Sequence, residues 1–257
     1  MNDQIYTGTI NSIQDLLESI SHIENNLGFD KLWFRGVANG IYGLEPSIFR
    51  RNIDATVERE LLNKFKVKAR PYLTSFNDEY WEWLFMMQHY GVPTRLLDWT
   101  ESALISLAFA LLYREEKHAT TDAAVWILNP IKLNKDYVKG FRDTELIPNI
   151  IDKTVRKIQV YEDPEIKNDF PVAIYGPLNN ERITTQKGVF TLFPFKDRFK
   201  IEDLPDSHNF LVKLNIPVAA IPTIKKQLIM LGMTETMVYP GLDSLSKEIV
   251  REVIDHV

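Results

Sequence analysis

The sequence predicts a single α+β domain in which a split or bent mixed sheet of about five to seven strands is flanked by helices. Helical patterns cluster in the first half of the chain, and short apolar runs typical of strands lie mostly in the second half. Strand and helix do not alternate regularly, which argues against a parallel βαβ architecture. No repeat and no linker divides the chain. We therefore expect one domain over residues 1–257, with an N-terminal helix in 1–30, a core over about 33–249 and an insertion at 132–169.

Composition narrows the class of protein. A hydrophobic fraction of 45% and an aromatic fraction of 11% are ample for a packed core. The net charge of -5 provides no basic field, so it does not indicate a nucleic acid as partner. The absence of cysteine excludes disulfides, thiolate catalysis and Cys-ligated zinc. It is also compatible with a reducing cytoplasm, where we expect the protein.

The sequence also argues against membrane association and against a metal site. The first residues lack the basic and apolar regions of a signal peptide, and the longest apolar run, 103–113, is far shorter than the ~20 residues of a membrane span. We therefore expect no membrane partner. None of the five histidines is paired with another at the spacing of metal ligands, so we expect no metal.

The first predicted helix is followed by a predicted strand that contains Arg35. Residues 12–26 predict a helix that Ser12 caps and Gly28 ends. The apolar residues that follow predict a buried strand with Arg35 at its end, just before Gly36. The planar guanidinium of Arg35 suits a phosphate or carboxylate ligand, and an ion pair with a nearby Asp or Glu is the equal alternative.

Two helices follow. Asp54 caps the first, whose apolar residues recur at steps of four through Ala69. Its other face is basic, which is typical of a solvated surface and, less often, of an anion-binding one. The second, 78–90, is apolar nearly all round and is therefore expected to be buried. Gly91 and Pro93 end it.

The segment from Gln88 to Ala110 organises the chain. Its first half predicts a short polar loop between two apolar helices, and that loop contains His89, Thr94, Arg95, Asp98 and Trp99. Asp98 is placed to cap the next helix. One interpretation is an ion pair between Arg95 and Asp98 that pins the two helices. The other is that Asp98 orients Arg95 toward a ligand, with Trp99 as a wall, and we expect a mixture of the two.

Further helices and strands are predicted after this loop. Small residues keep the helix that directly follows the loop slim, so it can approach a neighbouring backbone closely: Ala103, Ser106, Ala108 and Ala110. Four apolar runs predict strands at 123–128, 171–175, 189–193 and 210–214. A short helix is expected around 149–158, and longer ones at 221–231 and 244–256.

Polar residues interrupt apolar sequence at three places: Arg35, the 89–98 loop and the 182–188 segment. Each borders a predicted strand or a buried helix. Polar groups that meet apolar walls are typical of a ligand site. We therefore expect Arg35, Arg95, Asp98 and Gln186 to line one cleft.

The motifs at these places resemble a known family. Phe34-Arg35-Gly36, the block Gln88-His89-Tyr90-Gly91-Val92-Pro93-Thr94-Arg95-Leu96-Leu97-Asp98-Trp99-Thr100 and the segment around Gln186-Lys187-Gly188 resemble the FRG domain. The late Leu231-Gly232-Met233 and Tyr239-Pro240-Gly241-Leu242 are similar to the end of that family. The resemblance implies a bacterial protein in stress or antiphage defence, such as a toxin or effector.

The order of these parts also resembles, more distantly, the ADP-ribosyltransferases, which implies their fold and NAD as co-substrate. By that resemblance Arg35 would hold phosphate, and Gln186 would stand where a late Glu contacts the nicotinamide ribose. The implied catalytic residues are Gln186, Asp98 and Arg35, and the implied cofactor-binding residues are Arg35, Gly36, His89, Thr94, Arg95 and Thr100.

Gln186 differs in charge from the Glu that the ADP-ribosyltransferases have at this position. Cleavage of a glycosidic bond builds positive charge on the sugar, which a carboxylate stabilises. Gln186 brings no charge, so Asp98 or Glu181 would have to supply it. The alternative function is a non-catalytic module that binds a nucleotide, a nucleic acid or a protein, and no motif indicates the acceptor.

Overall fold

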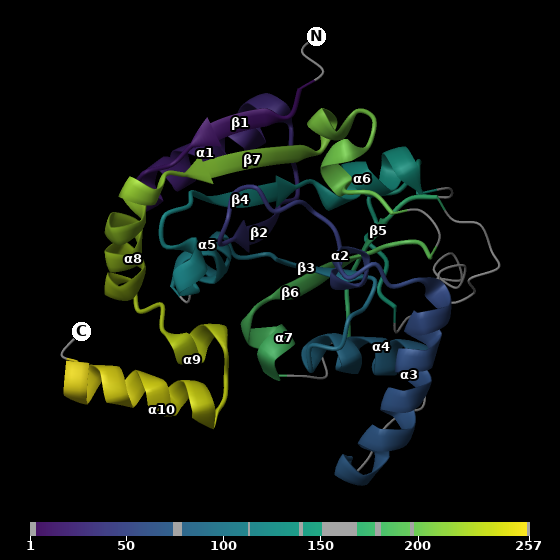
Figure 1. Cartoon of the computed structure of the whole chain (residues 1–257). Helices are drawn as coiled ribbons and strands as arrows, with labels where there is room; N and C mark the ends of the chain where they lie inside the picture. Colours follow the sequence, from purple (N-terminus) through teal and green to yellow (C-terminus); the bar gives the residue numbers. More distant parts are fainter. Residues whose placement is uncertain are drawn as a thin grey trace.

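The computed structural model describes residues 4–73, 79–112, 114–138, 141–150, 169–177, 181–195 and 198–255. Within them, one mixed sheet of seven strands is surrounded by helices (Figure 1), which confirms the predicted α+β class. The strands are β1 Tyr6–Thr9, β2 Trp33–Val37, β3 Leu96–Thr100, β4 Ala123–Leu128, β5 Val172–Ile174, β6 Gly188–Leu192 and β7 Leu211–Ile216. The helices are α1 Ile13–Leu27, α2 Ser47–Arg50, α3 Ala55–Ala69, α4 Tyr80–His89, α5 Ala103–Leu111, α6 Pro130–Tyr137, α7 Glu181–Thr185, α8 Ile221–Met230, α9 Glu235–Val238 and α10 Leu242–Val250.

The strand order is β1-β7-β4-β2-β3-β6-β5. The edge strand β1 runs parallel to β7, and the other described pairings between these seven strands are antiparallel. Strand β1 was not expected, because its four residues are mostly exposed and lack an apolar pattern. It adds to the edge of β7 through backbone pairing, which composition does not reveal.

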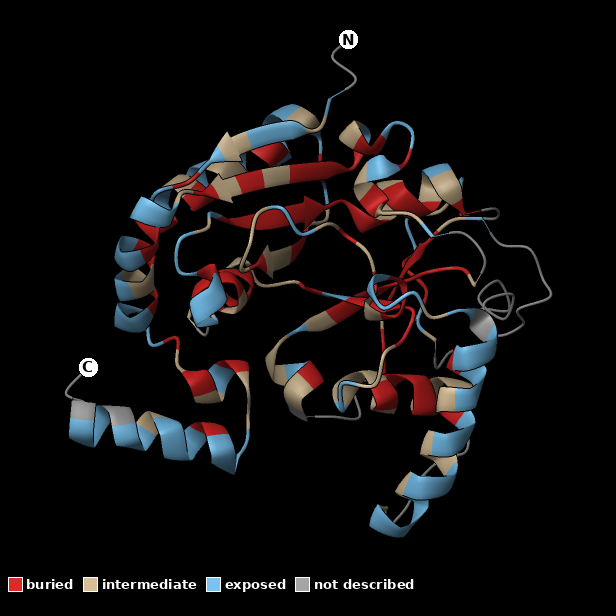
Figure 2. Ribbon diagram, viewed as in Figure 1, coloured by how far each residue is buried: buried red, intermediate tan, exposed pale blue. Residues whose placement is uncertain are grey.

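Alternation along β4 builds a core on each face of the sheet. Its odd-numbered residues, such as Val125, pack with α1, α5 and α8, and its even-numbered residues, such as Trp126, pack in a second cluster with α2 and α6. All six β4 residues are buried, as the red strand in the middle of Figure 2 shows. A strand that is covered on both faces reads as a continuous apolar run, and its bounds match the prediction.

The sheet splits between β2 and β3. Strand β2 pairs with β4 over five residues but with β3 at one described position, Phe34 opposite Thr100. Just beyond this pair, Nη1 of Arg35 donates a hydrogen bond of 2.6 Å to the main-chain carbonyl of Asp98. The guanidinium thus satisfies an acceptor that a continuous ladder would have paired with a backbone amide. The predicted split or bent mixed sheet is one sheet in which the pairing between β2 and β3 is short, and this short pairing lies beside Arg35.

Helix α5 lies directly against β2. A Cβ atom built on Gly36 would lie 1.8 Å from the main-chain oxygen of Ser106, so no other residue fits there without movement of the helix. Of the small residues expected to keep this helix slim, Ser106, Ala108 and Ala110 are buried and Ala103 is partly buried. The predicted close approach is therefore confirmed, and its partner is Gly36.

The segment after Pro93 corrects one prediction. It is not a loop up to Asp98, because Leu96–Thr100 form β3, which pairs along its whole length with β6. Asp98 therefore lies in mid-strand and does not cap a helix. The cap of α5 is Ser102, whose side chain accepts from the amide of Ile105.

The expected insertion at 132–169 is described only in part. It begins inside α6, and Asn149 forms an isolated bridge with Tyr175. The short helix expected around 149–158 falls almost entirely on residues outside the described ones.

Candidate functional site

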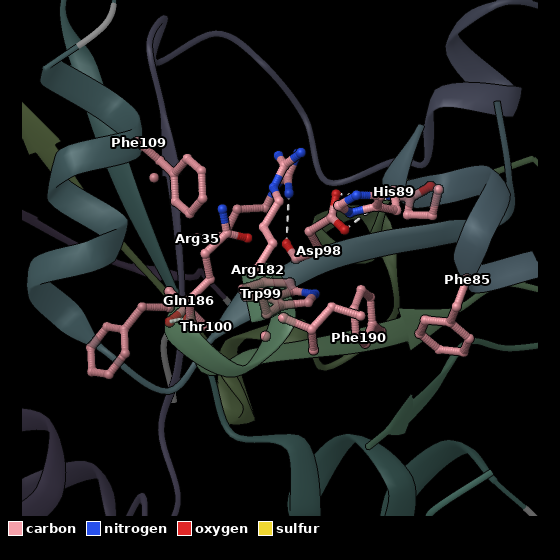
Figure 3. Close-up of a pocket in the computed structure, with 15 residues that line it drawn as sticks. Arg35, Phe85, His89, Asp98, Trp99, Thr100, Phe109, Arg182, Gln186 and Phe190 are labelled. Atoms are coloured by element: carbon pink, nitrogen blue, oxygen red, sulfur yellow. Dashed lines mark hydrogen bonds between the residues drawn. The ribbon is translucent and has the colours of Figure 1, made fainter. Parts of the chain in front are cut away.

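A pocket of about 270 Å³ lies where the sheet splits (Figure 3). Strands β2, β3 and β6 and helices α4, α5 and α7 contribute to its lining. The separation of β2 from β3 opens the space, and the side chains of the surrounding helices close it. The polar residues that line it are Arg35, Gln88, His89, Asp98, Thr100, Arg182 and Gln186.

Asp98 reaches the pocket because of strand alternation. Its neighbours Leu97 and Trp99 are buried in the core, whereas Asp98 points the other way and is exposed. The side-chain amide of Gln88 donates to both of its carboxylate oxygens, at 2.9 and 2.8 Å. Thr94 in turn donates its hydroxyl proton to the amide oxygen of Gln88. These bonds fix the plane of the Asp98 carboxylate.

Arg35 provides a fixed positive charge. Burial lowers its pKa to about 10, while the Asp98 charge acts to raise that pKa and the charge of Arg50 lowers it further. The guanidinium therefore stays protonated near pH 7. Its Nε is buried without a hydrogen-bond partner among the described residues, although its Nη1 bonds the Asp98 carbonyl.

A second arginine comes from α7. The guanidinium of Arg182 lies 5.1 Å from the centre of the Tyr239 ring, in a cation–π arrangement. Burial, and then the charge of Arg182, lower the pKa of His89 below its ordinary value of 6.5. The positive charge of the pocket at neutral pH is therefore carried by Arg35 and Arg182, and His89 is a neutral imidazole.

Gln186 is held from two sides. Thr100 donates to its main-chain oxygen at 2.7 Å, and its own side-chain amide donates to the carbonyl of Val238 in α9. This second bond ties the pocket rim to the C-terminal part of the chain. Gln186 lines the pocket with its side-chain NH2 group already engaged.

Aromatic side chains form the apolar walls. Phe85 of α4 and Phe190 of β6 meet edge to face, with ring centres 4.7 Å apart. On the opposite side, Phe109 of α5 packs against Tyr239 in the same way, at 5.5 Å. A flat ring system is the shape of ligand that such walls favour.

The predicted pairing of Arg95 with Asp98 is wrong. Arg95 is 1% exposed, and its Nε lies 2.9 Å from an oxygen of Glu58 in α3. It also donates to the main-chain oxygen of Phe193 at 2.9 Å and to the hydroxyl of Tyr80 at 2.8 Å. Residues three apart along an extended chain point to opposite sides, so Arg95 and Asp98 could not share a face.

Most of the expected site residues converge. Arg35, Gly36, His89, Asp98, Thr100 and Gln186 line the pocket, whereas Thr94 and Arg95 are buried behind it. The roles implied for these residues stay predictions. Gln88, Arg182 and the phenylalanines of the wall were not among the expected site residues, although Arg182 lies in the 182–188 segment that was expected to border the site. Gln88 precedes His89 in the same polar block, which was the available signal. The side chain of Glu181 lies outside the described part.

Part of the chain matches a known protein family. Residues 30–119 match the family model of the FRG domain. The chain contains an FRG domain. The matched range holds Arg35, Gln88 and Asp98, whereas Arg182 and Gln186 of the same pocket follow it in sequence. No curated protein and no solved structure matches the chain.

The described part of the chain contains neither a cluster of metal ligands nor a membrane-spanning helix. No three His, Asp or Glu side chains of that part of the chain gather as ligands for a metal ion. None of its helices has the length and apolar character needed to cross a bilayer.

Proposed function

We propose that the pocket binds NAD and that the protein is an ADP-ribosyltransferase-like enzyme that cleaves the bond between nicotinamide and ribose. One observation carries the proposal: two guanidinium groups, Arg35 and Arg182, and one carboxylate, Asp98, line the same aromatic pocket. Arginines suit the phosphates of a nucleotide, and aromatic walls suit its rings. The distant resemblance of the motif order to ADP-ribosyltransferases supports NAD in particular.

The size of the pocket suits part of a dinucleotide. Its volume of about 270 Å³ is near the lower end of the roughly 300–1,000 Å³ of small-molecule sites. The nicotinamide ring and its ribose match this space, and the phosphates then lie toward the two arginines.

The chemistry follows from the charges. When the bond from ribose C1′ to the nicotinamide nitrogen breaks, its electron pair goes to that nitrogen and neutralises the ring. The positive charge moves to the sugar, where the Asp98 carboxylate stabilises it. An acceptor then bonds to C1′ and loses a proton. In this assignment Asp98 replaces the late carboxylate that Gln186 lacks.

The test is release of nicotinamide from NAD, followed by chromatography. We expect Asp98→Asn to lower kcat by about 10²–10³-fold, the scale of a lost electrostatic group in a transition state. The affinity for NAD should change little, because the charge acts on the transition state rather than on the bound substrate. Asp30→Asn removes an exposed carboxylate outside the pocket and should leave kcat unchanged. Equal rates for wild type and Asp98→Asn would refute the role of Asp98.

A non-catalytic nucleotide-binding module is the second candidate. It is favoured by the hydrogen bonds already made at the site, since both Asp98 oxygens and the Gln186 amide have protein partners. Calorimetric titration with NAD and with ADP-ribose separates the two functions. Binding of both ligands with no release of nicotinamide would establish the second.

The setting belongs to the same proposal. We propose that the protein acts as a toxin or effector in bacterial stress or antiphage defence, which the FRG domain resemblance supports. Growth arrest on expression of the wild type, relieved by Asp98→Asn, is the expected result.

A further inference from the structure

A second cavity lies beside the pocket and shares two side chains with it. It has a volume of about 390 Å³ and is lined by the turn between α9 and α10, by the first residues of α10, by His89 and by Arg182. His89 and Arg182 also line the first pocket. A molecule in the second cavity therefore reaches the first one at these two residues.

The imidazole of His89 is free to contact a ligand. It is the last residue of α4 and is half-buried, and its ring makes an edge contact with Tyr90, with centres 4.8 Å apart. No hydrogen bond joins its imidazole to any other residue that the structure describes. An imidazole that lines two cavities without a partner has a free nitrogen to offer a ligand.

We propose that His89 is the catalytic base of the transfer step and that the second cavity admits the acceptor. This inference rests on the proposed function and assigns the side of the reaction that the NAD pocket leaves open. The acceptor is a neutral hydroxyl or amine. The cavity lining holds one negative side chain, Asp243, and one positive side chain, Arg182, so its charges do not call for a charged acceptor.

The transfer step forms one bond at ribose C1′ and breaks another. The acceptor oxygen or nitrogen donates an electron pair to ribose C1′ and forms the new bond, and the bond from C1′ to nicotinamide has given its own pair to the leaving ring. The acceptor proton passes to the free nitrogen of His89. The imidazolium then loses that proton to solvent, which restores the enzyme.

The charges around His89 suit a base. Arg182 faces it from α7, Asp98 from β3, Tyr239 from the turn after α9, and Asp243 from α10. Burial and Arg182 hold the pKa of His89 below 6.5. The imidazole is therefore unprotonated at neutral pH, and activity should be lost on the acid side as it gains a proton.

The first test is nicotinamide release by the full chain, with His89→Gln as the variant. We expect a loss of at least about 10²-fold in kcat, with KM for NAD within about threefold, and loss of the acid limb of the pH profile. His22→Gln, on the exposed face of α1, is the matched control and should match the wild type.

The possible results distinguish failure of the proposed function from failure of the role of His89. A wild type that releases no nicotinamide would overturn the proposed function and this inference with it. A wild type that turns over NAD while His89→Gln keeps its kcat, with or without a raised KM, would overturn the role of His89 alone.

The second test uses methanol as the probe acceptor. The product splits between ADP-ribose and its methyl glycoside, and this ratio does not depend on the overall rate. Leu242, at the mouth of the second cavity and 82% exposed, can be replaced without loss of core packing. We expect Leu242→Trp to lower the methanol fraction at least twofold, because methanol is larger than water. Leu245→Trp, on the same helix outside the lining, should not change it. An unchanged ratio in Leu242→Trp would refute the second cavity as the entrance.

Discussion

At the scale of single residues, the block around β3 separates two charges that the sequence places close together. Arg95 is buried with Glu58, whereas Asp98 is exposed in the pocket and is held by Gln88. The first charge is part of the structural core, and the second is available for chemistry. Substitutions at the two positions should therefore affect different properties.

We expect Glu58→Ala to lower the free energy of unfolding by about 3–5 kcal/mol, because it leaves the Arg95 guanidinium buried without its carboxylate. Asp98→Asn should change that free energy by less than about 1 kcal/mol, since an exposed group loses little on substitution. Urea denaturation followed by circular dichroism measures both. A larger loss for Asp98→Asn than for Glu58→Ala would show that these assignments are reversed.

At the scale of elements, the contact between β2 and α5 decides the shape of the site. The helix can lie on the strand only because Gly36 has no side chain, and the main-chain oxygen of Ser106 occupies the space where a Cβ would stand. The next residue toward the N-terminus is Arg35, whose guanidinium bridges the split in the sheet. The Phe-Arg-Gly sequence thus combines a pocket charge with a packing requirement.

We expect Gly36→Ala to destabilise the fold by about 3 kcal/mol or more, because backbone of α5 must move to admit the methyl group. Gly40→Ala, in the loop that follows β2, is the matched control. Its added Cβ would lie 3.5 Å from the nearest atom, the oxygen of Ala123, which is an ordinary contact. Thermal melts of the two variants should differ by several degrees. Equal melting temperatures would contradict the close approach.

At the scale of the whole molecule, the C-terminal helix is attached by its polar side. Ser244 is buried, and Glu248 accepts from the amide of Thr236 in α9 at 3.1 Å. The apolar residues of the same helix are exposed, and α10 is mostly pale blue in Figure 2. Helix α10 therefore adds little to the apolar core, although it helps to line the second cavity.

This arrangement predicts different costs for two isoleucines. Ile249 of α10 is 49% exposed, and Ile224 of α8 is fully buried in the core. We expect Ile249→Ala to change the free energy of unfolding by no more than about 0.5 kcal/mol and Ile224→Ala to lower it by about 2–5 kcal/mol. Chemical denaturation measures both. A cost above 2 kcal/mol for Ile249→Ala would mean that this face is covered in solution.

The sequence by itself determined the elements whose pattern is local. Strand β4 and helices α1, α3 and α8 follow from continuous or periodic apolar residues and from caps such as Ser12 and Asp54, whose side chains accept backbone protons as expected. It also determined the α+β class and most of the pocket residues, because polar groups interrupt apolar sequence there. Arg35, which was expected at a strand end, lies in the middle of β2, and Gln186 lies just before β6.

Tertiary structure decided what depends on partners that are distant in the chain. Strand β3 exists because β6, about 90 residues later, pairs with it. Arg95 pairs with Glu58, which lies four residues before Leu62 on the buried side of α3. The apolar steps of four that end at Ala69 indicate a different side of this helix, because they include Val57, which is 40% exposed. The partner of a buried charge depends on which surfaces the fold brings together. The sequence around Arg95 does not show which distant residue will lie beside it.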